Sequence, residues 1–293
     1  MDTNVSGLRI LSIHAHPDDE SSKGAATTAK YAHEGHEVLV LTCTGGERGD
    51  IINPAMDKPG ILENMGEIRK EEMAAAAEAL GVKHKWLGYV DSGLPEGDPL
   101  PPLPEGCFAL YDDDVIGRDF VKVIREFRPH VIITYDENGG YPHPDHLMVH
   151  RASMIAWEKA GDENYHPELG EPWTPLKLYY SHGFVYQRMK LFHDRLVESG
   201  KSSPYGAMMA RWEAGFGDIM ARVTAQVECA EYFSHREAAL IAHATQIDPA
   251  GAFLATPVSV QQELWPTEEF ELARTRVATD LPEDDLFAGI EQN

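Results

Sequence analysis

Two short segments of the sequence carry an imidazole and a carboxylate at the spacing of a metal site. The first is HAHPDDE, residues 14–20. If Pro17 opens a helical turn, His16 and Asp19 at i, i+3 project to the same side and can bind one cation. Asp18 then points in a neighbouring direction, where a general base can accept a proton from a water molecule.

The second segment, NGGYPHPDH at residues 138–146, repeats the order of His, Pro, Asp and a second type of ligand. Each segment follows an apolar run and precedes a helical pattern, so both are expected where parallel strands end, the edge at which open α/β sheets bind ligands. His146 can then complete a set of two histidines and one aspartate. Three protein ligands with open positions are typical of a catalytic metal site. His143 remains free to donate to an oxyanion or to protonate a leaving group.

Other interpretations of these residues stay open. Pro and Asp also suit an ordinary helix start, and two aspartates after a first strand could hold Mg²⁺ in a receiver-like domain. Such a magnesium site prefers oxygen ligands, which His16 and His146 do not supply. A protein that only carries metal would have no use for the additional His143 and Asp18. Two histidines and a carboxylate suit Fe²⁺ as well as Zn²⁺, and we expect one Zn²⁺ per subunit. His14 and His150 are assigned structural roles.

The elements that must position both segments alternate along the chain. Repeated βαβ units predict an open, mostly parallel, Rossmann-like α/β sheet with helices on both faces. Residues 45–60, 93–106 and 137–144 are expected to be long loops. The expected strands are residues 8–14, 37–43, 85–88, 131–135 and 177–182, with residues 265–274 a late strand or short helix, and the expected helices are residues 21–34, 63–80, 114–127, 186–198 and about 223–244.

No repeat or linker divides the chain, so we expect a single catalytic domain over residues 1–293. Its Rossmann-like core would span about residues 8–183, and a C-terminal region of about residues 184–293 would pack over the active-site edge and complete the substrate pocket.

The composition excludes several classes of partner. Lys and Arg number 25 against 48 Asp and Glu, and the formal charge of −23 disfavours binding to nucleic acid or anionic membranes. The sequence shows no signal-peptide pattern and no apolar run approaching the ~20 residues that span a bilayer. Three widely spaced cysteines fit a reducing compartment. We therefore expect a cytoplasmic protein with a small-molecule substrate; the sequence leaves monomer and homo-oligomer open.

The pair HAHPDDE and GGYPHPDH resembles the signature of the PIG-L/LmbE-like family of zinc-dependent N-deacetylases. The resemblance implies that His16, Asp19 and His146 bind zinc and that Asp18 is the general base, in agreement with the spacing.

The resemblance also implies roles that spacing does not give. His143 would stabilise the tetrahedral intermediate and assist departure of the amine, and Tyr141 would help to polarise the scissile carbonyl. Arg69 and Asp91 would contact the glucosamine and inositol part of the substrate.

Further motifs, among them TGGERG, GYVDSGLP, HATQIDP and LWPTEEFELAR, resemble the actinobacterial branch of this family that acts on mycothiol S-conjugates. The implied reaction is hydrolysis of the conjugate's amide to GlcN-Ins and a mercapturic acid, in thiol-based detoxification. The alternative is deacetylation of GlcNAc-Ins in mycothiol biosynthesis. Lys23 in SSKG, where the deacetylase carries a smaller residue, is expected to contact the N-acetylcysteinyl part. His243 and Gln246 are further candidates for lining the pocket.

Overall fold

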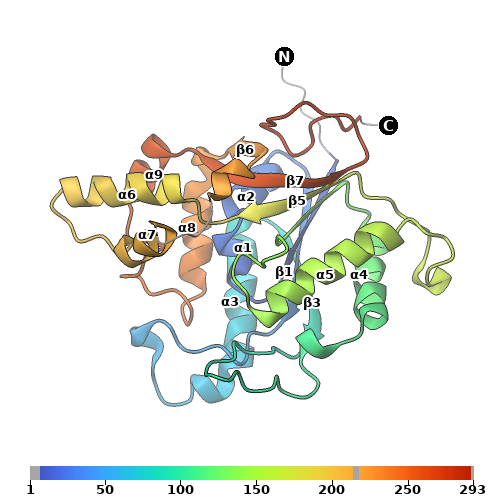
Figure 1. The fold of residues 1–293 in the computed structure, drawn as a ribbon, viewed down its shortest axis with the longest axis horizontal. Coiled ribbons are helices and arrows are strands. Elements are labelled where there is room, and N and C mark those ends of the chain that lie inside the picture. Colours follow the sequence, from blue (N-terminus) through green and yellow to red (C-terminus); the bar gives the residue numbers. More distant parts are fainter. Residues whose placement is uncertain (1–6, 214–217, 292–293) are drawn as a thin grey trace.

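The centre of the protein is a seven-stranded sheet with the order β3-β2-β1-β4-β5-β7-β6 (Figure 1). The structure is a computed structural model that describes residues 7–213 and 218–291. Strands β1 to β5 run parallel, whereas β7 is antiparallel to both β5 and β6. The strands are β1 (Arg9–His14), β2 (Glu37–Thr44), β3 (Lys83–Tyr89), β4 (Val131–Thr134), β5 (Lys177–His182), β6 (Ala225–Glu228) and β7 (Thr267–Thr275).

Helices cover both faces of this sheet. Side chains alternate between the faces along β1, so Leu11 packs in the core under α4 and α5, and Ile10 packs in the opposite core. In Figure 1, α4 and α5 lie together on one side, and α2, α3 and α8 lie on the other. The α-helices are α1 (Asp19–Ser22), α2 (Ala25–His33), α3 (Met65–Leu80), α4 (Asp113–Phe127), α5 (Pro144–Lys159), α6 (Tyr186–Glu198), α7 (Gly206–Glu213), α8 (Phe233–Ala242) and α9 (Val258–Leu264).

The sheet brings the two histidine segments together. β1 ends at His14 and β4 ends at Thr134, and the two strands pair in parallel with Ile10 opposite Val131. The strand order reverses direction at β1, so the loops after β1 and β4 flank the crevice in which open α/β sheets bind ligands. The predicted fold class and the predicted position of the segments are both confirmed.

The C-terminal third of the chain extends the same sheet. After β7 the chain returns to β5, where Lys177 forms an ion pair with Glu283 and both side chains are fully buried. The Tyr179 hydroxyl donates to the same carboxylate. Removing one partner of such a buried ion pair would strongly destabilise the fold, because the other charge would stay buried without a partner. The pair therefore fixes the returning segment to the sheet.

Two predicted helices were wrong in part. The helix predicted over residues 21–34 is broken at Lys23 and Gly24, where Gly24 has φ 81° and a Cβ would lie 3.3 Å from the Phe270 ring. The helix predicted over residues 223–244 begins only at Phe233, because residues 225–228 alternate between buried and exposed and pair with β7. The late segment forms a strand, β7, and α7 and α9 were not predicted. Among the described helices, none has the length and apolar character needed to cross a membrane.

Candidate metal centre and active site

His16, Asp19 and His146 meet in a buried cluster at the ends of β1 and β4. His16 Nδ1 lies 3.5 Å from Asp19 Oδ2, and His146 Nε2 lies 3.4 Å from the same oxygen. Two ligands at ~2.1 Å from a tetrahedral zinc ion are roughly 3.4 Å apart. The three side chains therefore stand at the separations that a zinc ion requires.

The environment of His146 supports a metal at this position. Its Nδ1 lies 2.8 Å from the Gly139 carbonyl oxygen and so carries the proton, which leaves a lone pair on Nε2. Nε2 is buried and has no hydrogen-bond partner among the described residues. A buried polar atom without a partner is costly, and a cation would satisfy it. Gly139 has to be glycine, because a Cβ there would lie 2.7 Å from the Cβ of His146.

His16 is oriented by a carboxylate that sequence reasoning did not single out. Asp145 is fully buried, and its Oδ2 lies 3.1 Å from His16 Nε2. The backbone N–H and the hydroxyl of Ser92 both donate to Asp145. His16 thus donates from Nε2 to Asp145 and presents Nδ1 to Asp19, an arrangement common among metal-binding histidines. Burial alone would lower the pKa of His16, but its hydrogen bonds with Asp145 and Asp19 raise it, so the carboxylates stabilise positive charge here.

A second group of four side chains is also close enough to hold a cation: His16, Asp91, His143 and Asp145. The carboxylates of this group are already occupied by hydrogen bonds, however. Asp91 accepts hydrogen bonds from the backbone N–H groups of Arg48 and Gly93, and Asp145 is bound by Ser92 and His16. The cluster that contains the unpartnered His146 nitrogen is therefore the better metal site.

Asp18 has a backbone conformation that is rare for any residue except glycine, with φ 114°. The sequence predicted a helical turn opened by Pro17, but the helix begins only at Asp19. His16 and Asp19 still meet, because the left-handed residue between them turns the chain. The N–H of Asp18 donates to Glu20 Oε2 at 2.9 Å, and this bond helps to hold the turn.

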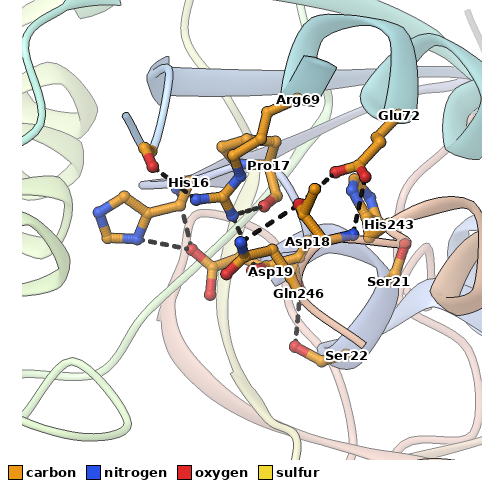
Figure 2. A network of polar contacts seen from close by, with 12 residues as sticks. His16, Pro17, Asp18, Asp19, Ser21, Ser22, Arg69, Glu72, His243 and Gln246 are labelled. Carbon is orange, nitrogen blue, oxygen red and sulfur yellow. Dashed lines mark hydrogen bonds and ion pairs between the residues drawn. The ribbon is translucent and has the colours of Figure 1, made fainter. Parts of the chain in front are cut away.

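Arg69 on α3 supports the same turn from above (Figure 2). Its buried guanidinium donates to Asp18 Oδ2 at 2.9 Å, to the Pro17 carbonyl at 2.5 Å and to the Gly46 carbonyl at 2.7 Å. A Cβ at Gly46 would lie 2.1 Å from the Arg69 Nη1, so the loop after β2 has to carry glycine there. Burial raises the pKa of Asp18, and the Arg69 cation opposes that rise.

The segment after α8 reaches the turn from the C-terminal third. His243 Nε2 lies 2.6 Å from Glu20 Oε1, and both side chains are buried. Burial would raise the pKa of Glu20, but His243 outweighs it and the pKa falls to about 2. The N–H and hydroxyl of Thr245 donate to Glu72 on α3. Glu72 and His243 lie beside Asp18 in Figure 2. These contacts were not predicted, because the HATQ motif alone does not indicate its partners.

His143 and Tyr141 lie beside the metal ligands. His143 is the N-cap of α5, and its Nδ1 accepts from the Asp145 N–H at 3.1 Å, so the neutral ring carries its proton on Nε2. Burial and the neighbouring His16 lower the pKa of His143 to about 4. The Tyr141 ring lies 4.6 Å from the ring of His146 and remains 45% exposed. A substrate can therefore approach the cluster past Tyr141.

The predicted substrate contacts also lie at the cluster. Lys23 Nζ is 2.6 Å from Asp19 Oδ1, and Asp91 Oδ1 is 3.5 Å from His16 Nε2. Gln246 is buried, and its amide donates to the Asp50 carbonyl and to the Thr245 hydroxyl. The two histidines assigned structural roles bond within the fold, His14 to Ser12 and His150 to the Tyr135 carbonyl.

Residues 11–157, which include both histidine segments, match the protein family described as PIG-L, GlcNAc-PI de-N-acetylase. The chain belongs to the PIG-L family. Its relatives include a Streptomyces coelicolor protein named mycothiol S-conjugate amidase, 56% identical over 98% of each chain. A Streptomyces scabiei protein named 1D-myo-inositol 2-acetamido-2-deoxy-alpha-D-glucopyranoside deacetylase is 39% identical over 97% of this chain and 90% of its own.

Solved structures support the PIG-L fold. N,N'-diacetylchitobiose deacetylase from Pyrococcus horikoshii aligns with a TM-score of 0.60 at 17% sequence identity. The alignment covers 90% of this chain and 83% of that one.

Replacing Asp145 with Asn should weaken metal binding, because the amide is a poorer acceptor for the His16 Nε2–H. We expect the affinity for zinc to fall by about 10- to 100-fold while the protein stays folded. The measurement is competitive zinc titration, with circular dichroism to check the fold. The matched control is Asp113→Asn at the exposed start of α4, which should leave affinity unchanged. An unaltered affinity in Asp145→Asn would contradict the role given to Asp145.

Proposed function

We propose that this PIG-L protein is a zinc-dependent amidase that hydrolyses the amide bond of mycothiol S-conjugates, giving GlcN-Ins and a mercapturic acid. The observation that carries this proposal is the end-to-end similarity to the Streptomyces coelicolor amidase, with the site residues present and clustered. Deacetylation of GlcNAc-Ins is the second candidate, favoured by the 39% identity to a deacetylase.

The metal-binding residues in this proposal are His16, Asp19 and His146. Zinc bound there would polarise the scissile carbonyl and lower the pKa of a water molecule from ~15.7 to ~7. Asp18 is the proposed general base that accepts the proton of the attacking water. Arg69 binds its Oδ2 and the left-handed turn orients the side chain, so Oδ1 is the atom proposed to accept the proton.

His143 and Tyr141 are proposed to act on the substrate side. The His143 Nε2–H is available to stabilise the negative oxygen that develops on the carbonyl and to assist protonation of the departing amine. Tyr141 is exposed enough to reach a bound substrate and to donate its hydroxyl to the same oxygen. Because water attacks directly, no acyl-enzyme forms.

The roles proposed for Lys23, Arg69 and Asp91 have different support. The Lys23 ammonium lies at Asp19, close to where an acyl group would bind, which supports contact with the N-acetylcysteinyl part. Arg69 and Asp91 are buried and bonded to protein atoms. This favours a role in which Arg69 orients Asp18 and Asp91 orients His16. Their contacts with glucosamine and inositol stay predictions. Three further expectations also stay predictions: that the chain forms a single domain, that the C-terminal region completes the substrate pocket, and that the protein is cytoplasmic.

A kinetic comparison of two substrates tests the proposal. The zinc-loaded protein should hydrolyse a bimane S-conjugate of mycothiol with a higher kcat/KM than GlcNAc-Ins. Lys23→Ser should lower the ratio of amidase to deacetylase kcat/KM, because it removes the ammonium near the acyl group; Lys70→Ser, at an exposed position of α3, is the control. A preference for GlcNAc-Ins in the wild type would favour the deacetylase instead.

Replacing Asp18 with Ala should lower kcat by about 10²- to 10⁴-fold, because the proton acceptor is lost. The zinc content should equal that of the wild type, since the carboxylate of Asp18 is bound by Arg69 and not by the cluster. Metal analysis alongside the kinetics gives both readouts. His146→Ala is the comparison and should lose both zinc and activity; loss of zinc in Asp18→Ala would refute the assignment.

The acid limb of the pH profile should respond to Arg69. Asp18 acts as a base only when deprotonated, so kcat/KM falls as the pH drops through its pKa. Removing the cation in Arg69→Met raises that pKa and should move the acid limb to higher pH, whereas Arg69→Lys, which keeps the charge, should move it less. An unmoved limb, measured between pH 5 and 9 at saturating zinc, would show that Arg69 does not act on the base.

A further inference from the structure

A cavity lies beside the segment that follows Asp19, where Ser21, Ser22 and Gly24 line it. Its volume is about 680 Å³, including the open mouth. One wall consists of Ser22 on α1 and Gly183 after β5, and the rest comes from α6, α8 and residues 252–269. Figure 1 shows α6, α8 and α9 grouped on the same side of the sheet edge as α1. None of the proposed catalytic residues lines this cavity, so the mechanism leaves it without a role.

The walls of the cavity are rich in large apolar side chains. Aromatic and thioether groups of this kind bind flat or apolar ligands through area burial and ring contacts. The main apolar residues of the lining are Phe184, Met189, Phe192, Phe233, Phe253 and Trp265.

The charged groups in the walls are compensated by the protein itself. Arg188 pairs with Glu269 at 2.6 Å, and Arg236 pairs with Glu268 at 3.2 Å. The Arg236 guanidinium also lies 4.0 Å above the Phe233 ring. Each arginine already has a carboxylate partner. A charged ligand would therefore find no unpaired opposite charge among Arg188, Arg236, Glu268 and Glu269. The cavity suits an uncharged guest.

The cavity is one side chain away from a metal ligand. Ser22 Oγ lies 3.2 Å from Lys23 Nζ, which in turn is 2.6 Å from Asp19 Oδ1. At Gly183 a Cβ would lie 2.9 Å from the Ser22 carbonyl oxygen, so the cavity wall packs directly on this segment. In a cysteinyl conjugate three bonds separate the amide carbon from the sulfur, a span of roughly 4 Å. A carbonyl held at the cluster would therefore direct the sulfur substituent toward Lys23 and Ser22, and Ser22 borders the cavity.

We infer that this cavity is the subsite for the S-linked substituent of the conjugate and that it selects uncharged apolar or aromatic groups. The inference rests on the proposed amidase function. It identifies the part of the protein that would recognise the S-linked substituent of the conjugate. The recognising residues come from the C-terminal third, whereas the metal ligands come from the first half of the chain.

Two variants change the cavity in opposite ways without touching the metal cluster. Phe253→Ala removes an aromatic wall at a residue that is 38% exposed, and Ala252→Trp fills the space. Leu191→Ala is the matched control, because Leu191 is 40% exposed on α6 and does not line the cavity. The substrates are the bimane and the methyl S-conjugates of mycothiol, together with GlcNAc-Ins.

Both cavity variants should lower kcat/KM for the bimane conjugate by roughly tenfold, because Phe253→Ala removes an aromatic contact and Ala252→Trp blocks the space that the bimane group would occupy. The methyl conjugate and GlcNAc-Ins should change by less than about twofold in the same variants. Leu191→Ala should leave all three substrates unaffected. Equal losses on the bimane and methyl conjugates, or no loss on the bimane conjugate, would overturn the inference.

Direct binding separates failure of this inference from failure of the proposed function. The probe is the bimane mercapturic acid, followed by its fluorescence anisotropy. If the wild type hydrolyses neither conjugate yet binds the probe, and Ala252→Trp does not bind it, the amidase proposal fails and the apolar subsite stands. If the wild type hydrolyses the bimane conjugate and the variants behave like the control, the amidase proposal stands and the subsite fails.

Discussion

The left-handed backbone at Asp18 is the constraint on which the rest of the site depends. It turns the chain within three residues, so that His16 and Asp19 face one another while the carboxylate between them points elsewhere. A non-glycine residue in this region costs roughly 1–3 kcal/mol, which the surrounding structure has to offset. Glu20 supplies a bond to the Asp18 N–H and Arg69 supplies bonds to its carboxylate and to the preceding carbonyl. This one turn therefore separates the carboxylate proposed as the base from the side chains proposed as metal ligands.

The same turn concentrates three carboxylates at consecutive positions, and their mutual repulsion has to be balanced. Each one has its own cationic partner, drawn from a different part of the fold. The partners come from α3, from the break after α1 and from the end of α8, so the acidic turn forms a junction between distant elements. The pairs are Asp18 with Arg69, Asp19 with Lys23, and Glu20 with His243.

The sheet and the clustering of His16, Asp19 and His146 could be predicted because their signals are local. Apolar runs indicated β1 and β4, and a repeated His-Pro-Asp pattern indicated the ligands at their ends. The turn at Asp18 could not be predicted, because its strain is tolerated only through contacts with α3 and α8. The partner of Glu20 lies 223 residues away, and nothing local to HATQ selects it. The sequence predicted helix where β6 forms. The alternation of buried and exposed side chains in β6 covers only four residues, and it indicates a strand only once β7 is there to pair with it.

The separation between His243 and Glu20 has a consequence for the newly made protein. Ribosomes add about 5–20 residues per second, so roughly 10–45 s pass between the emergence of these two partners. By then His146 has long been available to join His16 and Asp19, the other members of the candidate metal cluster. At that stage Glu20 and Arg69 can already hold the turn at Asp18, but Glu20 still lacks its partner His243. The chain becomes an enzyme only when its last third has been translated and folded against α1.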